Sequence, residues 1–229
     1  MRMSISCASW AVIPLVVLAS VPIQASAQGT FLEGHQSGIC AQASVTFQDA
    51  HTYGIGAHGG YSFHRLFDVS AGMSVARRHK ANSSSVDAEL DFYPTRGMTA
   101  ASAISPFLIA GFGLMDGSDI AAPSDLRYSA RKDGMVTYWA YGGGLTVVVS
   151  NPRDLITTFT VAYFQVSVEP PFKYYDDRLV NDAVSVASSL GRRDKKGRVT
   201  YGQVGLLFSD NGTMITLALG ATMPIEHGR

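Results

Sequence analysis

Charged residues are scarce in this sequence. Asp, Glu, Lys and Arg make up 16% of its 229 residues, against about 25% in a typical soluble domain. The 18 acidic and 18 basic residues also balance, so the chain lacks the basic excess that draws proteins to nucleic acid. We therefore expect no nucleic-acid partner.

Cysteine is nearly absent as well. Cys7 lies in an N-terminal leader, described below, which leaves Cys40 alone in the rest of the chain. A single cysteine excludes an internal disulfide, and a small buried residue is the commonest role of such a cysteine. Metal-ligand spacings such as HExxH and CxxC are missing too, so we expect no metal site and no cofactor.

Long apolar runs are missing beyond residue 28. No stretch there reaches the length of about 18 apolar residues that a membrane-spanning helix needs. The N-terminus has the pattern of a secretory signal: Arg2, an apolar region over residues 10–21, and the small-residue cleavage site Ala25-Ser26-Ala27. We predict that residues 1–27 are a signal peptide and that residues 28–229 form one exported domain.

Strict alternation of apolar and polar residues is what the sequence does contain. The clearest example is segment 84–93, where apolar and acidic residues take turns in the order Val86, Asp87, Ala88, Glu89, Leu90, Asp91, Phe92. Successive side chains of a strand point to opposite faces. The segment therefore predicts a strand with an apolar medium on one side and a polar one on the other.

Most of the exported chain repeats this design, with a turn or polar loop after each β-type segment. The predicted strands are 41–49, 53–63, 67–75, 84–93, 106–115, 135–149, 155–168, 199–208 and 213–223. Asn211-Gly212 between the last two is a strong hairpin signal. Regular strands joined by hairpins predict an all-β fold, a closed antiparallel up-and-down barrel, because closure hides the sheet edges.

The predicted connections differ in length. The short ones are 64–66, 151–154 and 209–212, and the long ones are 116–134 and 169–198, the second of which contains the basic run 192–196. Short turns at one end and long loops at the other are typical of outer-membrane barrels.

Alternation alone does not say which face points outward, because a soluble lipocalin-like barrel is apolar inside and a membrane barrel is apolar outside. Three features favour the membrane barrel. The polar faces are mostly Gly, Ser and Thr, the leader directs export, and aromatic residues gather near strand ends as in an interfacial girdle. These aromatic residues are Tyr61, Phe63, Phe67, Phe92, Tyr93 and Phe107.

Four segments rich in glycine and aromatic residues carry a family resemblance: 59–63, 67–72, 105–114 and 141–145. On these segments the chain resembles the OmpA-like and OmpX-like outer-membrane β-barrel family of Gram-negative bacteria, over about residues 41–223. The resemblance implies an eight-stranded transmembrane barrel in the cell outer membrane. It also implies contact with outer-membrane lipid and lipopolysaccharide, and insertion by the outer-membrane assembly machinery. The chain departs from the family in having no terminal aromatic residue after its last predicted strand.

The number of strands is open at this point. Nine strands are predicted, but a bacterial barrel with both termini on one side needs an even number. Leaving out 41–49 gives the eight that the resemblance implies. Adding 179–188 gives ten, although that segment also fits an amphipathic helix.

The acidic residues of segment 84–93 are the main candidate site residues. Asp87, Glu89 and Asp91 are expected inside the barrel, where buried carboxylates need cations. The candidate cations are Arg77, Arg78 and Arg131. Two interpretations stay open: an ion-pair network that plugs or gates a narrow lumen, and a wet interior in which each acid is solvated by itself.

Complete catalytic motifs are missing. Asp176-Asp177 resembles the paired acids of the omptin proteases, and His79 with Ser83 supplies ingredients of a lipid A enzyme, but neither pair has its partners. No nucleophile elbow GxSxG occurs. His58 lies on the polar face of its predicted strand, where a structural role is expected. We predict no catalytic residue and a protein that is not an enzyme.

The expected function is a structural or surface-interaction role through the long connections. A barrel of this size is filled by its own side chains, so it is not an open general porin. Two alternatives stay open: a barrel enzyme acting on lipid A or peptides at the outer leaflet, and a soluble periplasmic or secreted barrel that binds an apolar ligand. The sequence does not indicate the oligomeric state, and a monomer is favoured.

Overall fold

The computed structural model describes residues 31–32, 36–49, 52–63, 66–78, 81–95, 104–116, 134–150, 154–169, 179–209 and 212–225. These residues form ten strands: β1 (Ser37–Asp49), β2 (Thr52–Phe63), β3 (Phe67–Arg78), β4 (Ala81–Phe92), β5 (Ile104–Asp116), β6 (Met135–Ser150), β7 (Leu155–Val168), β8 (Leu179–Arg193), β9 (Val199–Ser209) and β10 (Gly212–Ile225). The predicted signal peptide and Arg131 lie outside the described residues. The described residues include no helix that is long and apolar enough to cross a membrane.

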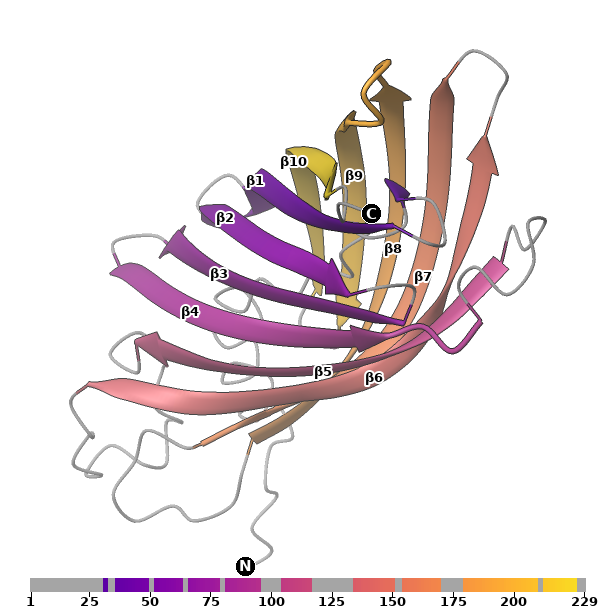
Figure 1. Cartoon of the computed structure of the whole chain (residues 1–229). Helices are drawn as coiled ribbons and strands as arrows, with labels where there is room; N and C mark the ends of the chain where they lie inside the picture. Colours follow the sequence, from indigo (N-terminus) through magenta and orange to yellow (C-terminus); the bar gives the residue numbers. More distant parts are fainter. Residues whose placement is uncertain are drawn as a thin grey trace, which may run out of the picture.

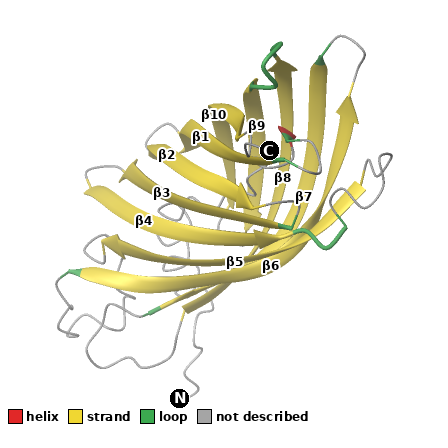
Figure 2. Cartoon of the chain, in the orientation of Figure 1, coloured by secondary structure: helices red, strands yellow, loops and turns green. Residues whose placement is uncertain are grey.

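The strands form a single closed barrel (Figures 1 and 2). Each strand pairs in antiparallel fashion with the next one along the chain, and β1 also pairs with β10, from Ser37 opposite Ile225 to Phe47 opposite Ile215. Closure removes the two edges that an open sheet would leave unpaired. The predicted all-β, up-and-down barrel is confirmed.

The described barrel has ten strands, so the count of eight implied by the family resemblance is wrong. The tenth strand is β8, which pairs with β7 from Val168 opposite Leu179 to Leu155 opposite Arg192, and with β9 on its other side. Its residues alternate, with Val180, Val184 and Val186 exposed and Ser185 buried between them. Burial that alternates with a period of two is that of a strand, whereas an amphipathic helix over 179–188 would bury residues with a period of about 3.6.

The connections lie at two ends of the barrel, which we call the terminal end, where β1 begins and β10 ends, and the far end. Connections 64–66 and 151–154 are at the terminal end, and the two stretches 117–134 and 169–178 are at the far end. The hairpin at 209–212 also joins its strands at the far end, so short turns are not confined to one end. The basic run 192–196 belongs to the end of β8 and to a tight turn at the terminal end, and not to a long loop.

The outer face of the barrel is apolar. Large hydrophobic side chains on all ten described strands are exposed, among them Leu219 at 74%, Met73 at 65% and Ile55 at 61%. On β4, Val86 and Leu90 point outward, while the acids between them are buried. This is the orientation of a membrane barrel and the reverse of a soluble one.

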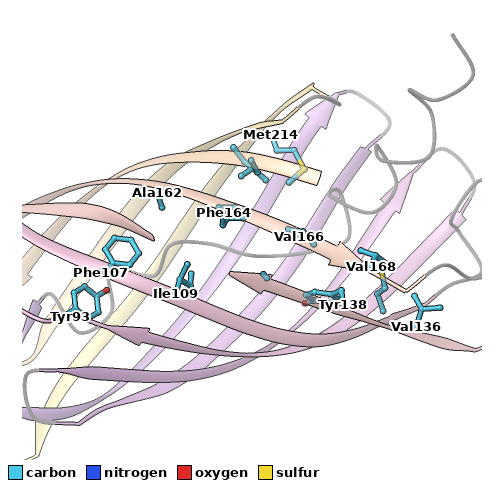
Figure 3. Packing of buried hydrophobic residues seen from close by; sticks show 14 residues of the cluster. Tyr93, Phe107, Ile109, Val136, Tyr138, Ala162, Phe164, Val166, Val168 and Met214 are labelled. Atoms are coloured by element: carbon cyan, nitrogen blue, oxygen red, sulfur yellow. The ribbon is translucent and has the colours of Figure 1, made fainter. Parts of the chain in front are cut away.

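Aromatic residues border this apolar face at both ends. At the terminal end, Phe63 and Phe67 are exposed, and Phe67 stacks on Phe92 with ring centroids 5.1 Å apart. Tyr93 and Phe107 were expected in the same girdle, but they are 1% and 3% exposed and lie inside the barrel (Figure 3). Both residues do lie close to strand ends, since Tyr93 follows β4 and Phe107 is near the start of β5. Their side chains, however, point into the barrel and not outward.

Two outward tyrosines in the half of the barrel toward the far end, Tyr141 and Tyr163, belong to a polar network across β6, β7 and β8. Tyr163 donates a hydrogen bond to the Asp182 carboxylate over 2.8 Å, and Gln165 Nε2 donates to the same oxygen over 2.9 Å. Tyr141 donates to Gln165. Rings that face lipid while their hydroxyls meet polar groups mark the boundary of a membrane-facing band.

The glycine run of β6 lies where this long strand passes close to the backbone of β7. A Cβ atom built on Gly142 would lie 2.1 Å from the Tyr163 carbonyl oxygen, and one on Gly144 would lie 2.3 Å from that of Val161. Both atoms are backbone and cannot move aside easily. The glycines therefore allow the backbones of β6 and β7 to come close together, and the run lies within a strand and not in a loop.

Candidate functional site

The candidate site is a group of buried carboxylates on β3 and β4, which we call the acidic ladder. Its members are Asp68, Asp87, Glu89 and Asp91, with exposed fractions of 7%, 9%, 9% and 2%. Asp68 lies opposite Asp91, and Gly72 lies opposite Asp87 in the β3–β4 register. All four point into the barrel, because they are buried while the residues that alternate with them, such as Val69, Val86 and Leu90, are exposed.

Asp87 lies beside a histidine from β2. The His58 Nδ1 atom is 3.7 Å from Asp87 Oδ2, and both side chains are 9% exposed. The imidazole reaches across β3 at Gly72, where a Cβ atom would come within 2.3 Å of His58 Nδ1. Glycine at position 72 thus supplies the space that brings the two side chains together.

A tyrosine from β6 approaches Asp87 from the opposite side in the same way. Tyr138 is 0% exposed, and a Cβ atom on Gly113 of β5 would lie 2.3 Å from its Cζ atom and 2.5 Å from its hydroxyl oxygen. Gly113 is the partner of Asp87 in the β4–β5 register. The Tyr138 hydroxyl therefore points over β5 toward the acids of β4.

A large polar side chain lies over a glycine at another place around the barrel as well. Tyr201 of β9 lies over Gly220 of β10, and its hydroxyl donates to Gln42 Oε1 of β1 over 3.0 Å. Gln42 is paired with both Gly220 and His58. One continuous row of inward positions thus alternates large polar side chains with glycines and passes through Asp87.

Several polar atoms in this row, and one on the neighbouring Glu89, have no hydrogen-bond partner among the described residues. They are His58 Nε2, Asp87 Oδ1, Glu89 Oε1 and Tyr138 OH. Buried polar atoms are nearly always bonded to protein, water or an ion. The row therefore has the donors and acceptors to hold water or a small ion. No three His, Cys, Asp or Glu side chains of the described part are grouped to hold a metal ion.

Of the three predicted cations, the structure describes the side chain of Arg77 only. Arg77 ends up on the outer, exposed face of β3, so its predicted place in the interior is wrong. Arg78 is the last residue of β3, but its side chain is outside the described part, as is the whole of Arg131. The reason for the error at Arg77 is parity, since Asp68, Ser70 and Gly72 set the even positions of β3 inward.

An apolar wall of buried side chains lies next to the acidic ladder, beginning on β5, the neighbour of β4 (Figure 3). It runs along β5, β6 and β7 and includes Phe107, Ile109, Phe164, Val166 and Val168, all at most 3% exposed. Side chains this buried fill the space beside the ladder. The described interior is therefore filled by apolar side chains along β5, β6 and β7.

The terminal end is also filled. Phe31, which precedes β1, is 1% exposed and stacks on Tyr201 with ring centroids 4.5 Å apart. Arg193 Nη2 donates to the Phe31 carbonyl oxygen over 3.2 Å. The ring lies over Gly191, where a Cβ atom would be 3.0 Å from Phe31 Cε1. The start of the described chain thus covers the interior at this end.

The weaker catalytic candidates gain no support. His79, Asp176 and Asp177 lie outside the described residues. Ser83 is 9% exposed on the inner face of β4, and Cys40 is buried on β1.

Sequence reasoning did not identify the residues that flank Asp87. His58 was placed on the polar face of its strand, but not beside an acid, and Tyr138 and Asp68 were not singled out. The available signal was glycine: Gly72 and Gly113 occupy inward positions of the strands on either side of β4. Reading that signal requires the register between strands.

Comparison with known proteins places the fold. No protein-family model matches this chain, and no curated protein matches it either. The solved β domain of the Bordetella autotransporter BrkA is similar, with a TM-score of 0.51 and 10% identity over 83% of this chain and 100% of that one. Ail of Yersinia pestis, with a TM-score of 0.35 and 11% identity over 85% and 100%, is a more distant match. The similarity to BrkA shows the fold, a β-barrel of the outer-membrane type.

Proposed function

We propose that this protein is a Gram-negative outer-membrane barrel that is exported by a cleaved signal peptide, residues 1–27, and presents its far-end connections at the cell surface. The observation that supports this proposal most strongly is how the side chains divide between the two faces of the barrel. Apolar side chains are exposed on the outside, and small polar residues lie inside. Such a surface is stable in lipid and prone to aggregate in water.

The surface role is assigned to the far end. The stretches 117–134 and 169–178 both connect strands there, opposite the end at which β1 begins and β10 ends. In bacterial barrels the termini face the periplasm and the longer loops face outward. These two stretches are therefore the proposed interaction elements, with lipopolysaccharide around the barrel and the outer-membrane assembly machinery as the route of insertion.

Neither a general porin nor an enzyme is proposed. The apolar wall and the acidic ladder fill the middle of the barrel, and Phe31 covers the terminal end, which supports a barrel without an open pore. The enzyme alternative rests on Asp176, Asp177, His79 and Ser83, and nothing in the described geometry assembles them. A monomer with OmpA-like or OmpX-like architecture, enlarged to ten strands, is the form we propose.

Cell fractionation and gel mobility test the location. The full-length chain expressed in a Gram-negative host should appear in the outer-membrane fraction and should migrate differently when boiled and unboiled. Recovery of a detergent-free soluble protein from the periplasm would contradict the proposal.

Surface exposure and closure need separate measurements. A protease cleavage site inserted between residues 124 and 125 should be cut when protease is added to intact cells. The matched control, the same site inserted after residue 152, should be protected. Vesicles containing the refolded protein should not swell in sugar solutions that enter through a general porin. Swelling at a porin-like rate would contradict a filled interior.

A further inference from the structure

The acidic ladder raises a question of charge balance that the described side chains do not answer. Asp68 and Asp91 have other contacts, so the question concerns Asp87 and Glu89. His58 lies beside Asp87, and it supplies one positive charge when protonated. Glu89 has only acids as charged neighbours: Asp91, Asp87 and Asp68.

The described lysine and arginine side chains do not reach Glu89. Arg77 points outward from β3. The others lie at the terminal end of β8 and in the turn that follows it: Arg192, Arg193, Lys195, Lys196 and Arg198. An ionised carboxylate that is buried without a cation is strongly unfavourable. Within the part of the chain that the structure describes, the remaining sources of a positive charge are a proton on Glu89 and a bound cation.

A second observation favours a bound cation, namely the Tyr138 hydroxyl. It is fully buried, has no hydrogen-bond partner among the described residues, and extends over Gly113 toward Asp87 and Glu89. A carboxylate oxygen of Glu89 and one of Asp87 are likewise without partners. Three hard oxygen atoms without partners thus lie on β4 and β6 in the same part of the register, and hard oxygen ligands suit alkali and alkaline-earth cations.

We propose that Asp87, Glu89 and the Tyr138 hydroxyl form an interior binding site for a monovalent alkali cation, Na⁺ or K⁺. A single charge balances Glu89 when His58 balances Asp87. A divalent ion would require more acidic ligands than the site offers, in keeping with the lack of a three-ligand group in the described part. The cation ties β4 to β6 across β5 and helps to keep the interior filled.

Unfolding of the refolded mature protein in detergent tests the site. The midpoint of unfolding, followed by the loss of the unboiled gel band, is measured in NaCl, KCl and N-methylglucamine chloride at equal ionic strength. A ligand that binds only the folded state raises the midpoint. We expect a rise of about 2–5 °C in Na⁺ or K⁺ over the bulky organic cation.

Two isosteric variants locate the effect. Glu89→Gln and Tyr138→Phe should each abolish most of the difference between salts, while Asp182→Asn, at an exposed carboxylate of β8, should leave it unchanged. If Glu89 simply carries a proton, the wild-type midpoint will be equal in all three salts. Tyr138→Phe will then be neutral or stabilising, because it only removes a buried hydroxyl without a partner.

A salt difference that persists in Glu89→Gln or in Tyr138→Phe would also overturn the proposal, since the cation would bind elsewhere. Should Glu89→Gln fail to refold, Tyr138→Phe decides by itself, because the ring and its packing remain.

Discussion

Glycines place the polar side chains of this interior. His58 lies over Gly72 and Tyr138 over Gly113, so each ring occupies the volume in which a neighbouring strand would otherwise carry a side chain. These glycines have ordinary strand conformations, and their role is to leave space. A row of large side chains alternating with glycine fills a narrow barrel without a clash, and at Asp87 it brings two polar groups onto one carboxylate.

Gly113→Ala tests this arrangement at the scale of one residue. The new methyl group would overlap the Tyr138 ring, with a closest distance of 2.3 Å. We expect a loss of about 1–3 kcal/mol in the free energy of unfolding, because the ring must leave its position. The neighbouring inward glycine is the control: a Cβ atom on Gly111 would meet its nearest atom at 3.5 Å, so Gly111→Ala should be close to neutral. Equal effects of the two variants, measured by urea unfolding in detergent, would contradict the role of Gly113.

Most strands of this protein could be predicted because the alternation of apolar and polar residues is strong within each segment. The predicted strand 155–168 coincides with β7, and 199–208 differs from β9 by one residue. β8 was the difficult element, since Asn, Ala, Ser and Gly fill its inner positions and have weak strand preference. The backbone of β8 takes its form from pairing with β7 and β9 along its length, which local composition does not report.

A lipid-facing position on β8 tests that element. Val186 points outward between Val161 and Leu206 in the register. Arginine at a mid-membrane position costs about 2–4 kcal/mol, so Val186→Arg should lower the unfolding midpoint in lipid vesicles strongly, and Val186→Ala should lower it little. If residues 179–188 formed a loop or a surface helix, the two variants would unfold alike.

The close approach of β6 to β7 allows a second test at the scale of an element. Gly144→Ala places a methyl group 2.3 Å from a backbone oxygen of β7, so we expect the two strands to separate locally at a cost of about 1–3 kcal/mol. Gly59→Ala is the matched control, because the nearest atom to its Cβ would be 3.8 Å away. The fraction of protein that refolds in detergent should fall for Gly144→Ala and stay at the wild-type value for Gly59→Ala. A wild-type yield for both would argue against a close approach at Gly144.

Closure between the first and last strands shapes the whole molecule. Thr46 of β1 lies opposite Thr216 of β10, and their hydroxyl oxygens are 3.3 Å apart. This contact joins residues that are 170 positions apart in the chain, and nothing local in either strand announces it. With β1 and β10 paired, the acidic ladder and the apolar wall both line one closed interior.

A designed disulfide at the closing seam tests the shape of the whole molecule. In a Cys40→Ala background, Thr46→Cys with Thr216→Cys should form an intramolecular disulfide after refolding, visible as a shift in mobility on a non-reducing gel. Constraining so long a loop should stabilise the fold by about 4–5 kcal/mol in the chain-entropy model. Thr46→Cys with Gln203→Cys, placed on β9 instead, should not cross-link. An open sheet would fail to cross-link in both cases.

The sequence by itself determined the strands and their two faces. Alternation over segment 84–93 assigned Val86 and Leu90 to one medium and Asp87, Glu89 and Asp91 to the other, and the structure has the same division. This was possible because side-chain direction in a strand has a period of two and depends on adjacent residues only.

Tertiary structure alone decided the count of strands, the end at which each connection lies, and the neighbours of each buried acid. Ten described strands close the barrel, and that number puts 209–212 at the far end with 117–134. The register between β2, β3, β4, β5 and β6 brings His58 and Tyr138 to Asp87 and leaves Arg77 outside. Register follows from hydrogen bonds between strands and from the space left by distant glycines, and these depend on residues far apart in the chain.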